Sequence, residues 1–325
     1  MRAGLARHPG ALVIFGLAAV TPLFVRDAYF LDTLILILLW GALSAAWNVA
    51  GGYAGQVSIG HASFFGIGAY AAALLGTRWQ QSPWLGMLVG VLLSIAAGAA
   101  IGYLSNRLKG PYFALSTIAF SQVLLIVASR WRGLTSGSEG IPVPFRPGFG
   151  TLGLGHVAWA YLALAVAVLY WAIQVWLDHS RFGYRLAGVR EDEDAAQALG
   201  IPARRLKVIA VTASAALTSV CGTLWAQYIG FVDASYVFSV DLSVRFALNA
   251  IIGGMGTAIG PFLGSILITS LETYLRATLS GMKSGLTGIY LIIYGTVLIL
   301  VVRFAPDGLT GLATRLRARR VRVRA

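Results

Sequence analysis

The sequence contains a single cysteine, Cys221, which lies in an apolar stretch. A lone cysteine excludes a disulfide or a cysteine-based metal cluster within the chain, and we expect Cys221 to be a small buried side chain. Charge is also scarce. Asp, Glu, Lys and Arg make up 11% of the 325 residues, whereas soluble domains contain about 25%. With 58% hydrophobic residues and a mean hydropathy of +0.76, the composition indicates a membrane protein.

Among the charged residues, acids are fewer than bases. The chain has 12 acids against 25 Lys and Arg, which gives a formal net charge of +13. In a soluble protein this excess would suggest nucleic acid as a partner. In a membrane chain it indicates contact with anionic lipid and a cytoplasmic location of the basic segments, so we expect no nucleic-acid partner.

A phosphate-binding loop of the form GxxxxGK[ST] is absent, and the segment SGMKSG at 280–285 has Met before its Lys. We therefore expect that the chain does not hydrolyse ATP itself and is not an enzyme. We also expect neither a bound cofactor nor a metal site.

Apolar runs are abundant, and a membrane-spanning helix needs about 20 mostly apolar residues. The sequence predicts an all-α fold, a polytopic transmembrane helical bundle of about nine spans. These spans are residues 10–25, 29–50, 57–76, 84–104, 112–129, 156–177, 208–228, 241–277 and 286–303. We expect 241–277, counted here as one span, to cross as two shorter helices broken near Gly253–Gly260; a re-entrant pair is the alternative. The first run is expected to remain as a span, because no small-x-small signal-peptide cleavage site follows it.

The distribution of Lys and Arg predicts the orientation of the spans. Alternation from a cytoplasmic N-terminus places about two thirds of these residues on the cytoplasmic side, including those of 178–207 and of the basic tail 304–325. The N- and C-termini are therefore both expected in the cytoplasm. Segment 130–155 becomes the one long external loop, and its Gly, Pro and Ser content predicts turns rather than a domain.

Two Gly-rich segments share a pattern: NVAGGYAGQVSIG at 48–60 and NAIIGGMGTAIGP at 249–261. Each has an Asn before a Gly-Gly pair, which suggests an internal duplication with broken helices; chance similarity between Gly-rich membrane sequences is the alternative. Broken helices surround the substrate path in many transporters, whereas glycines also serve simple helix packing. The candidate residues of a translocation path are Asn48, Gln56, Ser58, His61, Ser63 and Asn249.

Ser58 and His61 are three residues apart, the spacing of a nucleophile and its base on a helix. No acid accompanies them, so a membrane hydrolase is the weaker interpretation. Hydrogen bonding within the bundle, or a polar path, is the stronger one.

The segment VREDEDAAQALGIPARRLK at 189–207 is the most charged part of the chain, with acids first and bases last. Acids suit the positive end of a helix dipole, and Gly200 followed by Pro202 ends a helix. The order predicts a helix of about two turns whose small apolar face fits a shallow groove on a cytoplasmic partner. A solvated loop is the alternative.

This segment resembles the coupling loop of binding-protein-dependent ABC permeases. The segments NVAGGYAGQVSIGHASFFGIGAY (48–70), GPYFALSTIAFSQVL (110–124), LTSGSEGI (134–141) and NAIIGGMGTAIGPFLG (249–264) are similar to the branched-chain amino acid ABC permease family, in its LivM-type branch. The resemblance runs over roughly residues 30–305. It implies one permease domain over 1–325, with a cytoplasmic coupling loop at 178–207.

The resemblance further implies that the coupling loop transmits ATP-driven motion through Glu193, Asp194, Ala195, Ala196, Leu199 and Gly200. It implies as partners a LivH-type permease, two cytoplasmic ATPases of LivG/LivF type, a periplasmic binding protein and the lipid bilayer. The location implied is the bacterial inner membrane. The function implied is import of branched-chain or related amino acids by alternating access. A secondary carrier or channel without an ATPase is the alternative, and Glu272 is the one acid that suits a proton-coupled carrier.

Overall fold

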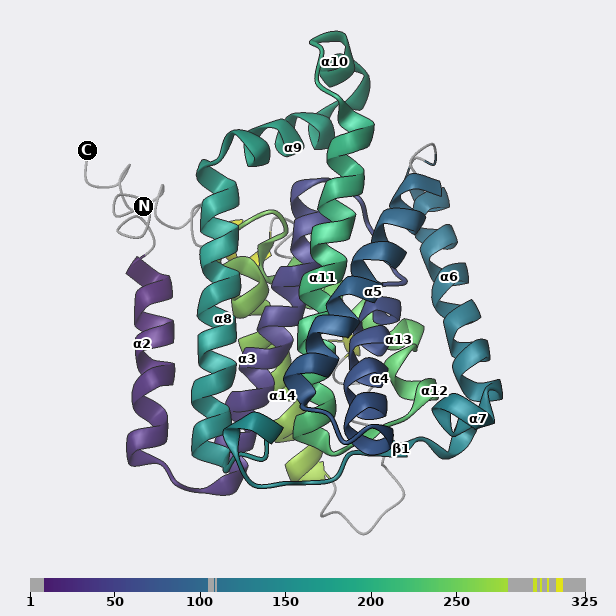
Figure 1. The fold of residues 1–325 in the computed structure, drawn as a ribbon. Coiled ribbons are helices and arrows are strands. Elements are labelled where there is room, and N and C mark those ends of the chain that lie inside the picture. Colours follow the sequence, from purple (N-terminus) through teal and green to yellow (C-terminus); the bar gives the residue numbers. More distant parts are fainter. Residues whose placement is uncertain are drawn as a thin grey trace, which may run out of the picture. The chain divides into compact units, whose positions relative to one another are not determined.

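The computed structural model describes residues 9–104, 108, 110–279, 295–296, 299, 303 and 308–311. Within them nearly all regular structure is helical (Figure 1). The chain divides into two compact units, each described here by itself. Unit 1 comprises residues 1–45, 160–175 and 248–325, and unit 2 comprises residues 46–159 and 176–247.

Unit 1 consists of helices that contact one another through aromatic rings and a hydroxyl group. It contains α2 (Pro9–Phe24), most of α3 (Ala28–Asn48), the middle of α8 (His156–His179), the end of α13 (Val240–Gly254) and α14 (Gly260–Leu279). The ring of Phe15 lies 5.6 Å from that of Trp171 and 5.3 Å from that of Phe262. The hydroxyl of Ser265 donates to the carbonyl of Ile37 at 2.7 Å. These contacts hold α2, α3, α8 and α14 together.

The end of α13 and the start of α14 form a Gly-rich reversal. Residues 255–259 separate the two helices, so the break predicted near Gly253–Gly260 is confirmed. The backbone carbonyl of Asn249 lies so close to Gly264 that a Cβ there would clash with it. Small residues permit this approach of two membrane helices.

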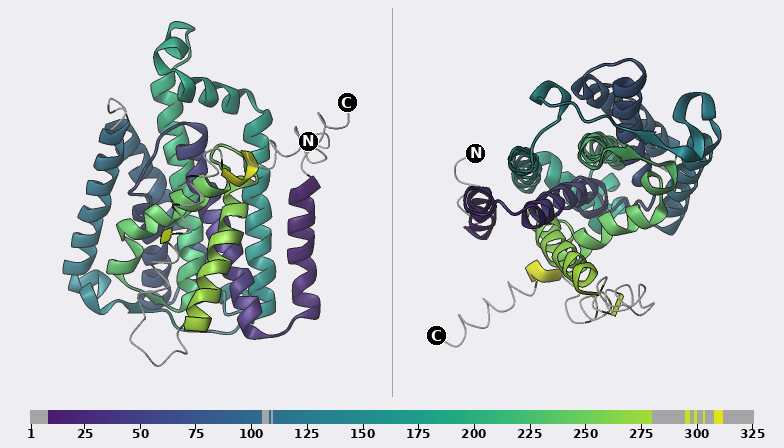
Figure 2. Two further views of the ribbon diagram at one scale, coloured as in Figure 1. Left: turned by 180° about the vertical axis from the view of Figure 1, so that it is seen from behind. Right: turned by 90° about the horizontal axis from the view of Figure 1, so that it is seen from below.

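Unit 2 is built around three helices in mutual contact, α4 (Ala62–Arg78), α5 (Pro83–Leu104) and α11 (Ala203–Ile229). A Cβ on Gly68 would clash with the carbonyl of Ser219, and one on Gly222 would clash with that of Phe65. Cys221 is fully buried here, as predicted. Helix α6 (Pro111–Arg130) stands at the edge of this group and exposes Tyr112, Leu115 and Val123 (Figures 1 and 2).

The remaining elements of unit 2 lie at its two ends. At one end are α9 (Arg181–Glu191) and α10 (Glu193–Ala198), and at the other are α7 (Arg132–Thr135) and strand β1 (Figure 1). Strand β1 (Ile141–Pro142) pairs antiparallel with β2 (Phe231–Val232), which precedes α12 (Ala234–Val237). Two 3₁₀ turns, η2 (Gly137–Glu139) and η3 (Phe149–Thr151), complete the 130–155 segment. The expectation of turns rather than a domain is confirmed, and this segment lies opposite the charged loop.

Six helices of the described residues are long and apolar enough to cross a membrane. They are Ala28–Tyr53, Pro83–Leu104, Pro111–Arg130, His156–His179, Ala203–Ile229 and Ala234–Gly254. The chain is thus a multi-pass helical protein, while nine spans and the cytoplasmic termini remain predictions. One predicted span, 57–76, is shorter than expected, because α4 begins only at Ala62 and has 17 residues. The first predicted span, 10–25, agrees with α2 to within one residue at each end, and this apolar helix is shorter than the six named above. The last predicted span, 286–303, and the tail 304–325 lie almost wholly outside the described residues.

Candidate functional site

Helix α3 does not run directly into α4. Its end continues as a π-helical turn, η1 (Val49–Tyr53), and residues 54–60 are irregular before α4 begins. Gly51 has no room for a Cβ beneath the ring of Trp47, and Gly55 has a φ of +67°. Both positions therefore require glycine. Single π-turns inside helices are rare and occur often at functional sites. We call residues 49–60 the break segment.

Most of the break segment is buried although its backbone is irregular; Val57 is its one exposed residue. The indole nitrogen of Trp47 donates to the carbonyl of Ser58 at 2.7 Å. The hydroxyl oxygen of Thr117 on α6 accepts from the backbone amides of Ile59 and Gly60, each at 3.2 Å. Irregular backbone at membrane depth is tolerated only where protein or water satisfies it, and here side chains of the same unit do so.

His61 follows the break segment and is fully buried. Its Nε2 lies 2.7 Å from the hydroxyl of Ser214, and that hydroxyl donates its one hydrogen to the carbonyl of Ala46 at 2.6 Å. In the neutral imidazole Nε2 therefore carries the proton and donates to Ser214, which leaves Nδ1 as an acceptor. Within the described chain Nδ1 has no hydrogen-bond partner. Among the described residues, the site thus contains a buried acceptor that no protein donor meets.

The other predicted path residues differ in how their side chains are used. The hydroxyl of Ser63 donates to the carbonyl of Gly60 at 2.5 Å. The hydroxyl of Ser58 is buried without a partner among the described residues, so Ser58 and His61 do not form the hydrogen bond of a nucleophile and its base. Gln56 and Asn48 are also buried in unit 2, whereas Asn249 belongs to unit 1. No group of three His, Cys, Asp or Glu side chains suits a metal ion in the described part of the chain.

The charged loop contains the short helix that the sequence predicts. The carboxylate of Asp192 caps α10 by accepting from the amides of Asp194 at 3.0 Å and Ala195 at 2.9 Å. Gly200 ends it with a φ of +80°, and the amide of Ile201 donates back to the carbonyl of Ala196. An N-terminal Asp cap and a left-handed C-terminal Gly delimit the helix by local interactions alone.

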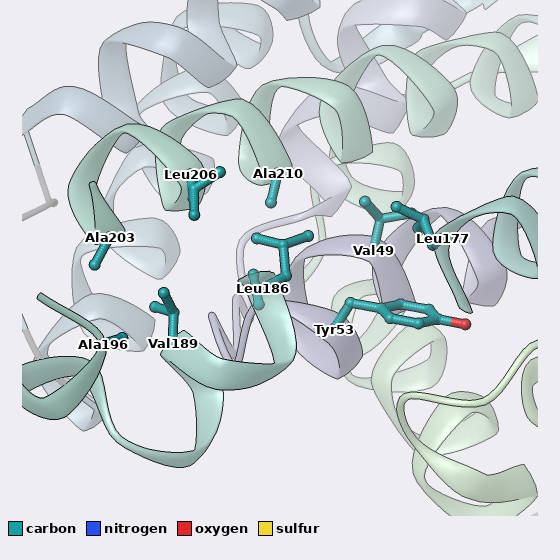
Figure 3. Packing of buried hydrophobic residues seen from close by; sticks show 10 residues of the cluster. Val49, Tyr53, Leu177, Leu186, Val189, Ala196, Ala203, Leu206 and Ala210 are labelled. Carbon is teal, nitrogen blue, oxygen red and sulfur yellow. The ribbon is translucent and has the colours of Figure 1, made fainter. Parts of the chain in front are cut away.

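The face of α10 that is free for a partner differs from the predicted one. Ala196 is 4% exposed and packs beside Val189 and Ala203 in a cluster of the chain's own residues (Figure 3). Its methyl group is therefore not available to a groove on another protein. Leu199 is 82% exposed, and Asp194 and Ala195 are exposed as well. We call Asp194, Ala195 and Leu199 the exposed face of α10.

The side chain of Glu193 also contacts another residue of this chain and does not face a partner. Its carboxylate lies 2.5 Å from the ammonium nitrogen of Lys207 on α11, and the two side chains are 14% and 9% exposed. The pair ties the start of α10 to the start of α11. No local pattern identifies this contact, because the two residues are 14 positions apart and belong to different helices.

The loop is joined directly to the break segment. A guanidinium nitrogen of Arg190 on α9 donates to the carbonyl of Gly52 at 2.9 Å. The hydroxyl of Tyr53 donates to a carboxylate oxygen of Asp178 at 2.6 Å. Val49 and Tyr53 share a buried cluster with Leu186 of α9 (Figure 3). Sequence reasoning missed Arg190, Tyr53 and Lys207 as site residues.

Comparison with known proteins gives a consistent result. Residues 29–302 match the family described as branched-chain amino acid transport system / permease component. The chain is 28% identical over 303 residues to the high-affinity branched-chain amino acid transport system permease protein LivM of Escherichia coli K12, covering 86% of this chain and 69% of the relative. It is 24% identical to the permease LivH of the same organism (84% and 91%). It is 28% identical to the autoinducer 2 import system permease protein LsrC of Enterobacter sp. 638 (81% and 76%).

Proposed function

Because the chain belongs to the family of branched-chain amino acid transport system permease components, we propose that it imports branched-chain or related amino acids as one subunit of a larger transporter. In this proposal a LivH-type permease pairs with it in the bacterial inner membrane. Two cytoplasmic ATPases drive alternating access, and a periplasmic protein delivers the solute. The autoinducer 2 permease among its relatives carries a different solute by name, so the amino acid specificity rests on the LivM and LivH similarity.

The observation that carries the ATPase proposal is the exposed face of α10. This helix lies at one end of unit 2 (Figure 1), and the large apolar side chain at its C-cap, Leu199, is 82% exposed. The side chain of Asp192 caps the start of the helix, and the Glu193–Lys207 ion pair attaches the helix to α11. These contacts fix the position of the exposed face relative to the rest of unit 2. An apolar side chain on a fixed short helix suits insertion into a groove of a partner protein.

The break segment supports a path for a solute without net charge. No Asp, Glu, Lys or Arg occurs from residue 46 to residue 62. The polar side chains there carry hydrogen-bonding groups, among them the Ser58 hydroxyl and the His61 Nδ1, neither of which has a partner among the described residues. An uncompensated charge at membrane depth is costly, so such groups favour a zwitterionic or neutral solute over an ion.

Replacing Leu199 with Arg tests the ATPase proposal. The full chain is expressed with its genomic neighbours, and copurification of an ATPase and its ATP hydrolysis are measured. Because central residues carry most of the binding energy of an interface, we expect the amount of bound ATPase to fall about tenfold or more. Leu199→Met, which keeps the apolar volume, should retain it. Unchanged copurification of the Arg variant would contradict docking at this face. Uptake by the wild type with no ATPase attached would favour a carrier.

A further inference from the structure

Arg190 holds the end of the broken helix to the charged loop. Its Nη1 donates to the carbonyl of Gly52 at 2.9 Å, across 138 positions of sequence. Gly52 lies in the last turn of η1, where backbone carbonyls lack partners within the helix. A cation at this position also suits the negative end of the helix dipole. Arg190 thus caps the helix formed by α3 and η1 from another element.

Contacts with Glu191 and Gly55 orient the guanidinium of Arg190 toward the carbonyl of Gly52. Glu191 accepts from Nε at 3.2 Å and from Nη2 at 2.8 Å, which orients the planar group and leaves Nη1 for Gly52. The aliphatic part of Arg190 lies over Gly55, where a Cβ would come within 2.9 Å of its Cγ. The side chain of Arg190 therefore contacts the irregular turn at two places, at the carbonyl of Gly52 and at Gly55.

Within the described residues, no other side chain of α9 makes a polar contact with the break segment. Leu186 and Val189 of α9 belong to the same buried apolar cluster as Val49 and Tyr53, with Leu186 on the side nearer Tyr53 (Figure 3). Packing alone permits sliding, whereas a directional hydrogen bond to one carbonyl fixes the register between α9 and the π-turn.

We infer that Arg190 is the positioning residue through which movement of the loop helices α9 and α10 is passed to the break segment. The inference rests on the proposed function, because it needs an ATPase that moves α10. Displacement of α9 pulls on Gly52 through Arg190 and shifts residues 54–60, which carry Ser58. Without Arg190 the ATPase still docks on α10, but the movement of α9 and α10 no longer shifts residues 54–60.

The test compares Arg190→Ala with Arg185→Ala in the complete transporter in nanodiscs and proteoliposomes. Arg185 lies on the same helix, is exposed, and makes no hydrogen bond or ion pair within the described part of the chain. Amide hydrogen exchange of residues 49–60 is measured in the nanodiscs. ATP hydrolysed per radiolabelled L-leucine imported is measured in the proteoliposomes.

In the Arg190→Ala variant we expect exchange of residues 49–60 to be about fivefold faster, as for loss of one hydrogen bond. We expect ATP consumed per leucine to rise about fivefold, within the usual range of coupling between sites. The ATPase should remain bound, Arg185→Ala should match the wild type, and Arg190→Lys should restore coupling in part.

Three results separate the alternatives. Unchanged exchange in Arg190→Ala overturns the inference, because the hydrogen bond then does not hold the turn. Faster exchange with an unchanged ATP-to-leucine ratio also overturns it, because Arg190 is then merely structural. A wild-type chain with no attached ATPase overturns the proposed function, and the inference falls with it.

Discussion

The ammonium group of Lys207 lies 2.5 Å from the carboxylate of Glu193, and both side chains are nearly buried. The pair joins the first turn of α10 to the second turn of α11. An exposed ion pair would contribute little, but removal of one partner from a buried pair leaves an uncompensated charge.

We therefore predict that Lys207→Met or Glu193→Ala each lowers the free energy of unfolding by about 3 kcal/mol, the scale found for breaking buried pairs. Denaturant titration of the chain in detergent measures it. The swapped double variant, Glu193→Lys with Lys207→Glu, should recover part of the loss. In the double variant Glu193→Ala with Lys207→Met, losses equal to the sum of the two single losses would contradict a direct interaction.

Gly200 and Gly188 form a matched pair for testing the end of α10. A Cβ at either position would meet no atom within 4 Å, but only Gly200 has a positive φ. Gly200→Ala should destabilise the chain by about 1–2 kcal/mol, the cost of placing an L-residue in the left-handed region. Gly188→Ala, inside α9, should instead stabilise it by about 0.5–1 kcal/mol through helix propensity. Equal effects of the two changes on the unfolding midpoint would contradict this explanation of the helix end.

Ser58→Ala distinguishes a path residue from a packing residue. The hydroxyl of Ser58 is buried and has no partner within the described residues, so its removal should leave stability unchanged or slightly raised. If the hydroxyl binds the solute, uptake of radiolabelled leucine should fall about fivefold, as for one hydrogen bond. The control, Ser63→Ala, removes a hydroxyl that donates to Gly60 and should mainly reduce stability. Normal uptake in Ser58→Ala would remove Ser58 from the path.

The orientation of unit 2 can be tested with single cysteines in a Cys221→Ala background. Ser138 and Gln197 are exposed at opposite ends of the unit. The positive-inside distribution predicts that a cysteine at 138 reacts with a membrane-impermeant thiol reagent added outside, and that one at 197 reacts only after permeabilisation. Labelling of both from outside would refute the predicted topology.

The ends of the short loop helix follow from the sequence alone. Asp192 and Gly200 act on backbone groups within a few positions of themselves, so their residue types suffice to predict where α10 begins and ends. The apolar runs likewise predict helices such as α5 and α11, because each satisfies its own backbone within one segment. The same locality explains the confirmed break between Gly253 and Gly260.

Only the tertiary structure shows which face of α10 is exposed and which interactions the break segment makes. A helix of two turns has small apolar residues on more than one side. Only the position of α11 decides that Ala196 faces inward, that Leu199 faces outward and that Glu193 pairs with Lys207. The π-turn at Val49–Tyr53 and its contact with Arg190 depend on segments 138 positions apart. Hydropathy and spacing describe how a residue interacts with its neighbours in the chain, whereas these contacts depend on which distant helices pack together.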